Sequence, residues 1–471
     1  MYAHNNFVNA VLIMPKTKSA IWAKQALTQN GWEEDVLVSL DEAGRITSVE
    51  SQQPAEGHKV DILLPSPANA HSHSFQRAMA GLTERRGPDA SDSFWTWRQL
   101  MYRFLDQLTP NHIEAIAAFV QMEMLEAGYT TNVEFHYIHH QPGGQPYDNI
   151  AELSERVVAA AGQSGIGLTL APVLYQYGGC DERALGDGQI RFGNDMDRFT
   201  KLFEGAKRAI ANLGGDANIG VAPHSLRAVS PSGLAEVVKL CPDGPIHLHL
   251  AEQIAEVEEI QHAWGKRPVE WLLDNAEIDE RWCLIHCTQM LAHETTSLAR
   301  TGAVAGLCPL TEASLGDGIF DGVHWMNEGG RIALGSDSNI RITLSEELRL
   351  LDYTQRLRDK SRAALATTEQ STGRRIFEAV NAGGAQAASR SSGQIVPGAW
   401  ADLMALDAAP LGLAEQGGDT ILDYYIFAGD DRLITDVWAA GRHMVRDGRH
   451  MNREAISKRY ADVMSSLRDV I

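Results

Sequence analysis

Cysteine is scarce in this chain, and the few cysteines that occur are not arranged as metal ligands or as a disulfide framework. There are five among 471 residues, and no two of them form a CxxC pair. This usage favours a reducing compartment in which the thiols stay free. We therefore expect no cysteine ligation of zinc, and we predict a cytoplasmic protein. The five are Cys180, Cys241, Cys283, Cys287 and Cys308.

Long hydrophobic runs and an excess of positive charge are also missing. No stretch of about 18 apolar residues occurs, and no basic region precedes the short apolar run near the N-terminus, so neither a membrane span nor a secretory signal is predicted. Acidic residues outnumber basic ones by 61 to 41, which gives a net charge of −20 at pH 7. Such a surface repels nucleic acid and anionic membranes. The expected partner is a small molecule.

The length and the order of patterns predict two domains. The 471 residues exceed the roughly 250 that are typical of one α/β barrel. From about residue 66 to residue 391, short β-like runs alternate with longer helical stretches, which is typical of βαβ units and a parallel sheet. We predict a hydrolase barrel over residues 66–391 and a small composite β domain built from residues 1–65 and 392–471.

Eight candidate strands can be counted in the central segment, which is the number needed to close a (β/α)8 TIM barrel. They are expected at residues 68–73, 131–136, 167–175, 219–224, 246–252, 283–287, 304–309 and 331–337. Apolar residues at three- and four-residue spacing predict helices over residues 111–127, 150–164 and 198–212.

The flanking segments have β character. DVLVSL and VDILL occur before the barrel, and GQIVPGAWADLMALD and YYIFAGDDRLITDVWAAGRHMVRDG follow it, before a helical run from Asn452. The fold class expected is thus α/β, with a TIM barrel and a small β-sandwich domain formed by the N- and C-terminal segments.

Polar side chains fall where several of the barrel strands end. Side chains two residues apart on a strand share a face, so His71 and His73 can point at one cation. Catalytic groups of such barrels lie at the C-terminal ends of the strands. The other candidates at these ends are His224, His247, His249, Glu252, His286 and Asp337.

Imidazole and carboxylate groups suit zinc, and a catalytic zinc site keeps one position open for water. We predict one divalent metal, with zinc as the first choice and iron or manganese as alternatives. The predicted ligands are His71, His73, His249 and Asp337. His247 shares a face with His249 and remains an alternative, although a carboxylate three residues later favours His249. Histidines 58, 112, 262, 293, 324 and 450 are expected in helices or loops, exposed to solvent.

The strand-end motifs LPSPANAHSH, HLHLAE, CLIHC and GSDS resemble those of the deaminase branch of the amidohydrolase superfamily. Within that branch the chain is similar to the formimidoylglutamate deiminase family. The stretches that carry this similarity are HSHSFQRAMAGLTERRG, DSFWTWRQLMYRF, EFHYIHH, GVAPHSLRAVSP, HLAEQIAEVE, RPVEWLL and GLCPLTEASLGDGIFDG. The resemblance implies hydrolysis of N-formimino-L-glutamate to N-formyl-L-glutamate and ammonia, a reaction of histidine degradation.

The resemblance also implies a role for individual residues. Metal ligation falls to His71, His73, His249 and Asp337, and catalysis to Glu252, His286 and Asp337. Substrate contacts fall to Gln76, Arg98, Tyr137 and His224. Some relatives bridge two metals with a modified lysine after strand four, where this chain has VAPH, so a single metal is expected. A homodimer is implied as well.

Two other functions remain open from the residues alone. One is another aminohydrolase of the same superfamily, acting on a nucleobase or a triazine. The second is a metal-binding barrel with a regulatory or structural role. Glu252 and His286 disfavour this second possibility, because a purely structural metal site needs neither proton-handling groups nor an open water position.

Overall fold

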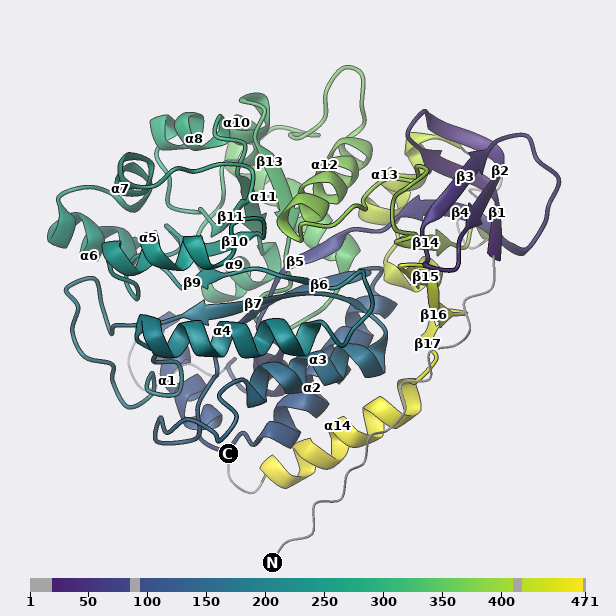
Figure 1. The fold of residues 1–471 in the computed structure, drawn as a ribbon. Helices are drawn as coiled ribbons and strands as arrows, with labels where there is room; N and C mark the ends of the chain where they lie inside the picture. Colours follow the sequence, from purple (N-terminus) through teal and green to yellow (C-terminus); the bar gives the residue numbers. More distant parts are fainter. Residues whose placement is uncertain (1–18, 85–93, 410–416, 469–471) are drawn as a thin grey trace, which may run out of the picture.

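A barrel of parallel strands forms the centre of the molecule, and helices surround it (Figure 1). The computed structural model describes residues 19–84, 94–409 and 417–468. The barrel strands are β5 (Ala68–Ser72), β6 (Thr131–His136), β7 (Gly167–Leu174), the short β8 (Asn218–Ile219) and β9 (Ala222–Pro223), β10 (Ile246–Leu250), β11 (Trp282–His286), β12 (Val304–Leu307) and β13 (Arg331–Leu334).

Pairing follows the order of the strands along the chain. One parallel sheet runs from β5 to β8, with β9 also beside β7, and a second runs from β10 to β13. Isolated parallel bridges join the two sheets at Val221 and Ile246 on one side, and at Ser72 and Asp337 on the other. With β8 and β9 as one position, all eight predicted strands are present, and the predicted fold class is confirmed.

Helices follow most barrel strands, as βαβ connections require. The three predicted helices appear as α2 (Pro110–Glu126), α3 (Glu152–Ser164) and α4 (Met196–Ile210). The others associated with the barrel are α1 (Phe94–Leu105), α5 (Pro231–Leu240), α6 (Ile254–Trp264), α7 (Pro268–Asn275), α8 (Ala292–Ala299), α9 (Pro309–Leu315), α10 (Gly322–Asn327), α11 (Leu344–Asp359) and α12 (Thr372–Ala387). A 3-10 helix, Ser74–Met79, follows β5 directly.

Both ends of the chain contribute to one further sheet, seen beside the barrel in Figure 1. Its order is β17-β16-β15-β14-β4-β1-β2-β3. The N-terminal strands are β1 (Ser19–Thr28), β2 (Gly31–Leu40), β3 (Ile46–Glu50) and β4 (His58–Pro65). The C-terminal strands are β14 (Leu403–Leu406), β15 (Ile434–Ala439), β16 (Arg442–Arg446) and β17 (Arg449–His450), and α14 (Arg453–Leu467) ends the described chain. The exact domain boundaries stay a prediction.

One segment expected to be β is helical. The run YYIF lies in α13 (Asp419–Phe427), not in a strand. Its buried residues include Leu422, Tyr425 and Ile426, which lie on one face of a helix and pack in the main hydrophobic core. A short aromatic run does not distinguish a strand from a buried helix by periodicity alone, and packing against α12 decides here.

The structure confirms the prediction for the cysteines and contradicts the prediction for His450. The five cysteines are buried and form no disulfide, as predicted. The expectation that His450 is exposed is wrong, because only 2% of the residue is accessible and its Nε2 lies 2.7 Å from the carbonyl oxygen of Ser164. His58 begins strand β4 instead of lying in a helix or loop.

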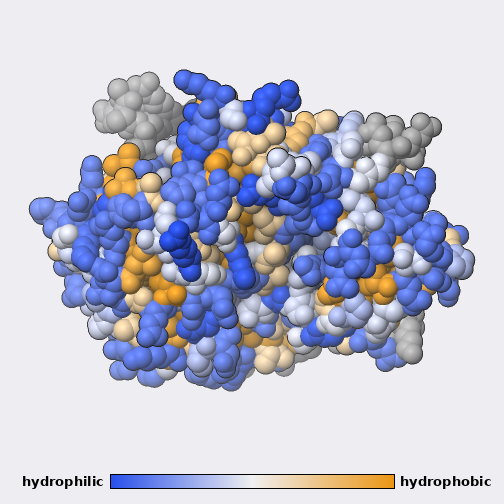
Figure 2. All heavy atoms as spheres, turned by 90° about the horizontal axis from the view of Figure 1, so that it is seen from above, coloured by the Kyte–Doolittle hydropathy of each residue, from blue (hydrophilic) through white to orange (hydrophobic). Residues whose placement is uncertain are grey.

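The surface is largely polar. Figure 2 shows a mostly hydrophilic face with separate hydrophobic patches. The large hydrophobic residues that are exposed in the described ranges include Ile254, Leu291 and Leu357, which come from three different helices or their starts. Among the described helices, none combines the length and the apolar character needed to cross a bilayer.

Candidate metal centre and active site

The predicted site residues gather at one end of the barrel, although they come from distant parts of the chain. His71 lies in β5, His286 ends β11, and His73 directly follows β5. His249 lies in β10, with Glu252 two residues beyond the strand. Apart from His71, all predicted catalytic, substrate-binding and metal-binding residues line one pocket.

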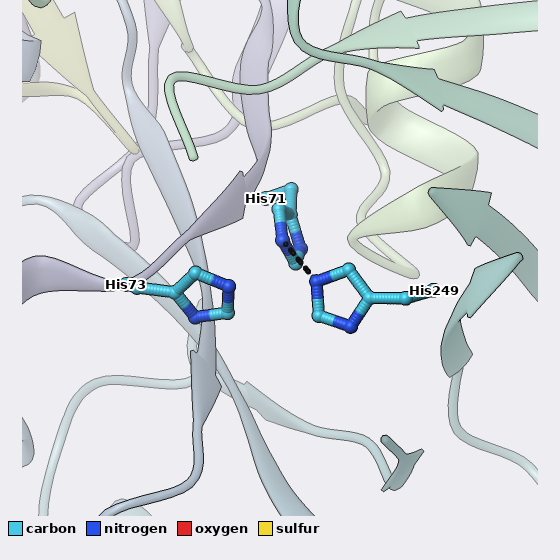
Figure 3. Close-up of side chains that lie close together, drawn as sticks. All are labelled: His71, His73 and His249. Carbon is cyan, nitrogen blue, oxygen red and sulfur yellow. Dashed lines mark hydrogen bonds between the residues drawn. The ribbon is translucent and has the colours of Figure 1, made fainter. Parts of the chain in front are cut away.

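Three imidazole rings, those of His71, His73 and His249, converge at this end of the barrel (Figure 3). One ring nitrogen of each of His71, His73 and His249 lies within 4.8 Å of the others. The Nε2 atoms of His71 and His249 are 3.1 Å apart. Two ring nitrogens at that separation attract one another only with a proton or a cation between them, so the arrangement suits a metal ion.

Asp337 completes the group. Its Oδ1 lies 3.4 Å from Nε2 of His71 and 3.4 Å from Nε2 of His73. The backbone holds these residues together, because Asp337 N–H donates to the His71 carbonyl at 2.9 Å and His73 N–H donates to the Asp337 carbonyl at 2.9 Å. Gly335 permits this approach, since a Cβ atom there would lie 2.7 Å from Cβ of His71.

The rings of His73 and His249 are oriented by carbonyl groups. Nδ1 of His73 lies 3.0 Å from the Phe135 carbonyl oxygen, and Nδ1 of His249 lies 3.0 Å from that of His224. A carbonyl accepts only, so Nδ1 carries the proton in both rings and Nε2 keeps a lone pair for a cation. Burial lowers the pKa of all three histidines, to about 3 for His71. The donor set therefore fits a divalent metal.

His286 is surrounded by carboxylates. Its Nδ1 lies 3.2 Å from Oε1 of Glu312, while Nε2 lies 3.9 Å from Oε1 of Glu252 and 3.8 Å from Oδ2 of Asp337. Burial alone would lower the pKa of His286, but these three acidic groups raise it to about 10. These acidic neighbours favour the protonated form of the ring, which can donate from both ring nitrogens.

Glu252 is buried beside His286, and its backbone N–H donates to Oε2 of Glu256 at 3.0 Å. Burial raises the pKa of Glu252, while the positive charges of His286 and Arg227 oppose that shift. A carboxyl group whose pKa is raised can carry a proton closer to neutral pH and release it to a stronger base.

His247 and His249 lie at different depths in the barrel. His247 is fully buried, and its Nε2 lies 2.9 Å from the carbonyl oxygen of Ala387, at the end of α12. It belongs to no group of potential metal ligands among the described residues. His249, one layer higher on the same face, is the histidine that meets His71.

The predicted substrate-binding residues form another wall of the same pocket. Nε2 of Gln76 donates to the Tyr137 hydroxyl at 2.9 Å. Nη2 of Arg98 donates to the Tyr175 hydroxyl at 2.8 Å. Helix α1, which carries Arg98, is held at its end by the buried Arg191, whose guanidinium donates to the carbonyls of Leu105 and Leu108. The position of Arg98 is thus set from within the core.

Two residues with a place in the site were not predicted. Arg227 lines the pocket, and its positive charge acts on both His224 and Glu252. Glu312 contacts His286 and also accepts the backbone N–H of Cys308 at 2.8 Å. Arg227 lies three residues after a strand-end histidine, and Glu312 lies in the first turn of α9, just after β12, so position relative to strand ends was the available signal.

Comparison with known proteins agrees with this geometry. The model of the amidohydrolase family matches residues 62–444, and the model of the N-terminal domain of formimidoylglutamate deiminase HutF matches residues 18–59. Formimidoylglutamate deiminase from Pseudomonas aeruginosa is 44% identical over 455 residues, which cover 96% of this chain and 100% of that protein.

Solved structures share the fold. An amidohydrolase from Brucella melitensis superposes with a TM-score of 0.92 at 44% identity and covers 95% of this chain and 99% of its own. An adenosine deaminase from Xanthomonas campestris with bound zinc has a TM-score of 0.79 at 20% identity, covering 96% and 98%. The chain therefore belongs to the amidohydrolase family and, within it, to the formimidoylglutamate deiminases.

Proposed function

We propose that this chain is a metal-dependent deiminase that hydrolyses N-formimino-L-glutamate to N-formyl-L-glutamate and ammonia, a step of histidine degradation. One observation supports this most directly. The pocket that holds the converging histidines is also lined by two arginines, Arg98 and Arg227, and by the buried acid Glu252. These are matching groups for a dianionic substrate with a cationic amidine at one end.

In the proposed site, His71, His73, His249 and Asp337 hold one divalent metal, for which zinc is the first choice. Three neutral imidazoles and one carboxylate support this assignment, and carbonyl groups orient the rings of His73 and His249. The metal supplies Lewis-acid chemistry that makes water acidic enough to act as a nucleophile near neutral pH.

Proton handling is assigned to three residues. Asp337 takes a proton from the attacking water, and His286, within 3.8 Å of Asp337, orients that water by a hydrogen bond. Attack on the formimino carbon forms a new C–O bond and a tetrahedral adduct. Glu252 donates a proton to the amidine nitrogen, so that the C–N bond breaks with loss of neutral ammonia and the product is a formamide.

Recognition of the glutamate part of the substrate is assigned to the pocket wall formed by the predicted substrate-binding residues. A guanidinium can make two parallel charge-assisted hydrogen bonds to one carboxylate, and the substrate has two carboxylates for Arg98 and Arg227. Gln76, Tyr137 and His224 complete the contacts. Burial, helped by the charges of both arginines, holds the pKa of His224 well below its usual value, so this ring stays neutral beside them.

The test is an ammonia-release assay with separate substrates. Protein loaded with zinc should release ammonia from N-formimino-L-glutamate much faster than from adenosine, guanine or a triazine. Parallel loading with Fe²⁺ and Mn²⁺ identifies the preferred metal. Faster turnover of a nucleobase or nucleoside would reject the proposed substrate, and equal activity after complete metal removal would reject metal dependence.

A further inference from the structure

A second group of potential metal ligands lies outside the barrel, on the sheet formed by the two ends of the chain. His58 begins β4, Asp436 lies in β15 and His443 lies in β16. One ligand atom of each residue lies within 4.8 Å of the other two. The three strands come from opposite ends of the sequence, so this group links the N-terminal and C-terminal parts of the sheet.

Both imidazoles approach the same carboxylate oxygen. Oδ1 of Asp436 lies 3.0 Å from Nε2 of His58 and 2.7 Å from Nε2 of His443. Two nitrogens and one oxygen in three neighbouring side chains form a two-histidine, one-carboxylate set, which is a common ligand set for Zn²⁺ and other divalent transition metals.

The rings are oriented before any ion binds. His443 stacks on Trp438 with ring centroids 4.4 Å apart, and His58 meets the edge of the same indole at 5.5 Å. The Trp438 side chain therefore limits the rotation of both imidazoles. Metal sites gain affinity when their ligands are oriented in advance by such contacts.

The three side chains of this group differ in their exposure to solvent. The side chains of Asp436 and His443 are 10% and 14% accessible, whereas that of His58 is 43% accessible. An ion can thus enter from the side of His58, and solvent can fill the fourth coordination position. The barrel site differs in this respect, because its histidines are almost fully buried.

We propose that His58, Asp436 and His443 form a second divalent-metal site, suited to Zn²⁺, that links β4 to the β15–β16 hairpin. In the ion-free protein, each Nε2 carries a proton and donates to Asp436. Binding of Zn²⁺ at Nε2 moves the proton of each neutral ring to Nδ1 and replaces two hydrogen bonds with three metal–ligand bonds.

Zinc stoichiometry tests this proposal. Protein with a loaded barrel site is washed with a mild chelator, dialysed against micromolar Zn²⁺ and analysed for zinc per chain. We expect two zinc ions in the unaltered protein and one in His443→Ala. Asp436→Asn, which preserves shape and hydrogen bonding, should also hold one. The matched control His262→Ala, an exposed histidine on α6, should still hold two.

The zinc counts and two further measurements decide whether the second site exists. A single zinc in the unaltered protein, or a second zinc that survives His443→Ala, would overturn the proposal and leave a hydrogen-bonded cluster only. Added Zn²⁺ should raise the melting temperature of the unaltered protein more than that of His443→Ala. Ammonia release should be the same in both proteins, so failure of this site is distinguishable from failure of the proposed deiminase activity.

Discussion

Two site residues adopt backbone conformations that side chains rarely take. His286 has φ of +73° and Asp337 has φ of +45°, and neither is a glycine. Such conformations cost roughly 1–3 kcal/mol each and persist where surrounding contacts hold them. For Asp337, the contacts are its paired backbone hydrogen bonds with His71, in β5, and with His73, directly after it. The strain therefore coincides with the residues to which proton handling is assigned.

At the scale of a single residue, the variant Glu252→Gln tests whether Glu252 delivers a proton to the leaving nitrogen. The amide keeps the shape of the side chain but cannot donate the proton that the leaving nitrogen requires, so turnover should fall by about 10² or more. Metal content, measured by elemental analysis, should stay unchanged. The exposed Glu258→Gln, on the following helix, serves as the control. Retained activity in Glu252→Gln would remove this residue from the mechanism.

Arg98→Met tests recognition of a carboxylate. The change should raise KM for N-formimino-L-glutamate by about 10-fold or more, because a charge-assisted hydrogen bond is lost. Activity on a formamidine without carboxylates should change little. Arg103→Met, an exposed residue of the same helix, is the matched control. An equal loss with both substrates would contradict the assigned contact.

Among the elements, a buried ionic network joins the small sheet to the barrel. Asp216, in the loop after α4, meets Arg442 of β16 at 2.6 Å and Arg390 at 3.2 Å. Arg390 also contacts Asp402 at 2.6 Å. Burial would raise the pKa of Asp216, but the two arginines outweigh it and lower the pKa to about 2. This network joins the sheet to the end of the barrel at which β8 begins.

Acid should weaken this connection. A folded-state pKa of about 2, below the ordinary 3.8, stabilises the protein above pH 4, and that contribution is lost as pH falls towards 2. Asp216→Asn should therefore lower the free energy of unfolding by about 2 kcal/mol at pH 7 and by less at pH 3, as measured by urea unfolding. Asp462→Asn, which alters an exposed residue of α14, is the control. A pH-independent difference would contradict this origin.

The elements differ in how well their sequence patterns predict them. The barrel strands are short apolar runs between long helical stretches, and that alternation indicated all eight. The β-rich C-terminal segment was ambiguous, since YYIF has strand composition but is buried on one side of α13. Its environment is created by α12 and the core, which are distant in sequence, so local pattern could not decide it.

For the molecule as a whole, metal removal should reduce stability. The proposed ligands come from the first, fifth and last barrel strands, so the ion stabilises the folded state over any state in which these strands separate. At a free metal concentration of 100 times Kd, the stabilisation is about 2.7 kcal/mol. The melting temperature of His443→Ala should therefore fall on chelation and recover with Zn²⁺. An unchanged value would argue against ligation across strands.

The site was predictable to a similar extent as the fold. His71, His73, His249 and Asp337 stand at strand ends, where barrel topology brings them together, and the structure places them in one group. Arg227 and Glu312 were missed because their relevance depends on how the segments after β9 and β12 pack around the pocket and His286. Their roles, like the homodimer, stay predictions.

The direct backbone pairing of β5's end with Asp337 has a consequence for biosynthesis. The ribosome delivers His71 and His73 with the first barrel strand, but Asp337, their carboxylate partner, follows the last barrel strand, β13. A nascent chain thus lacks the complete set of proposed ligands until the barrel can close. In the proposed site, acquisition of the ion is therefore a late event of maturation, and a chain that stops before Asp337 lacks the proposed carboxylate ligand.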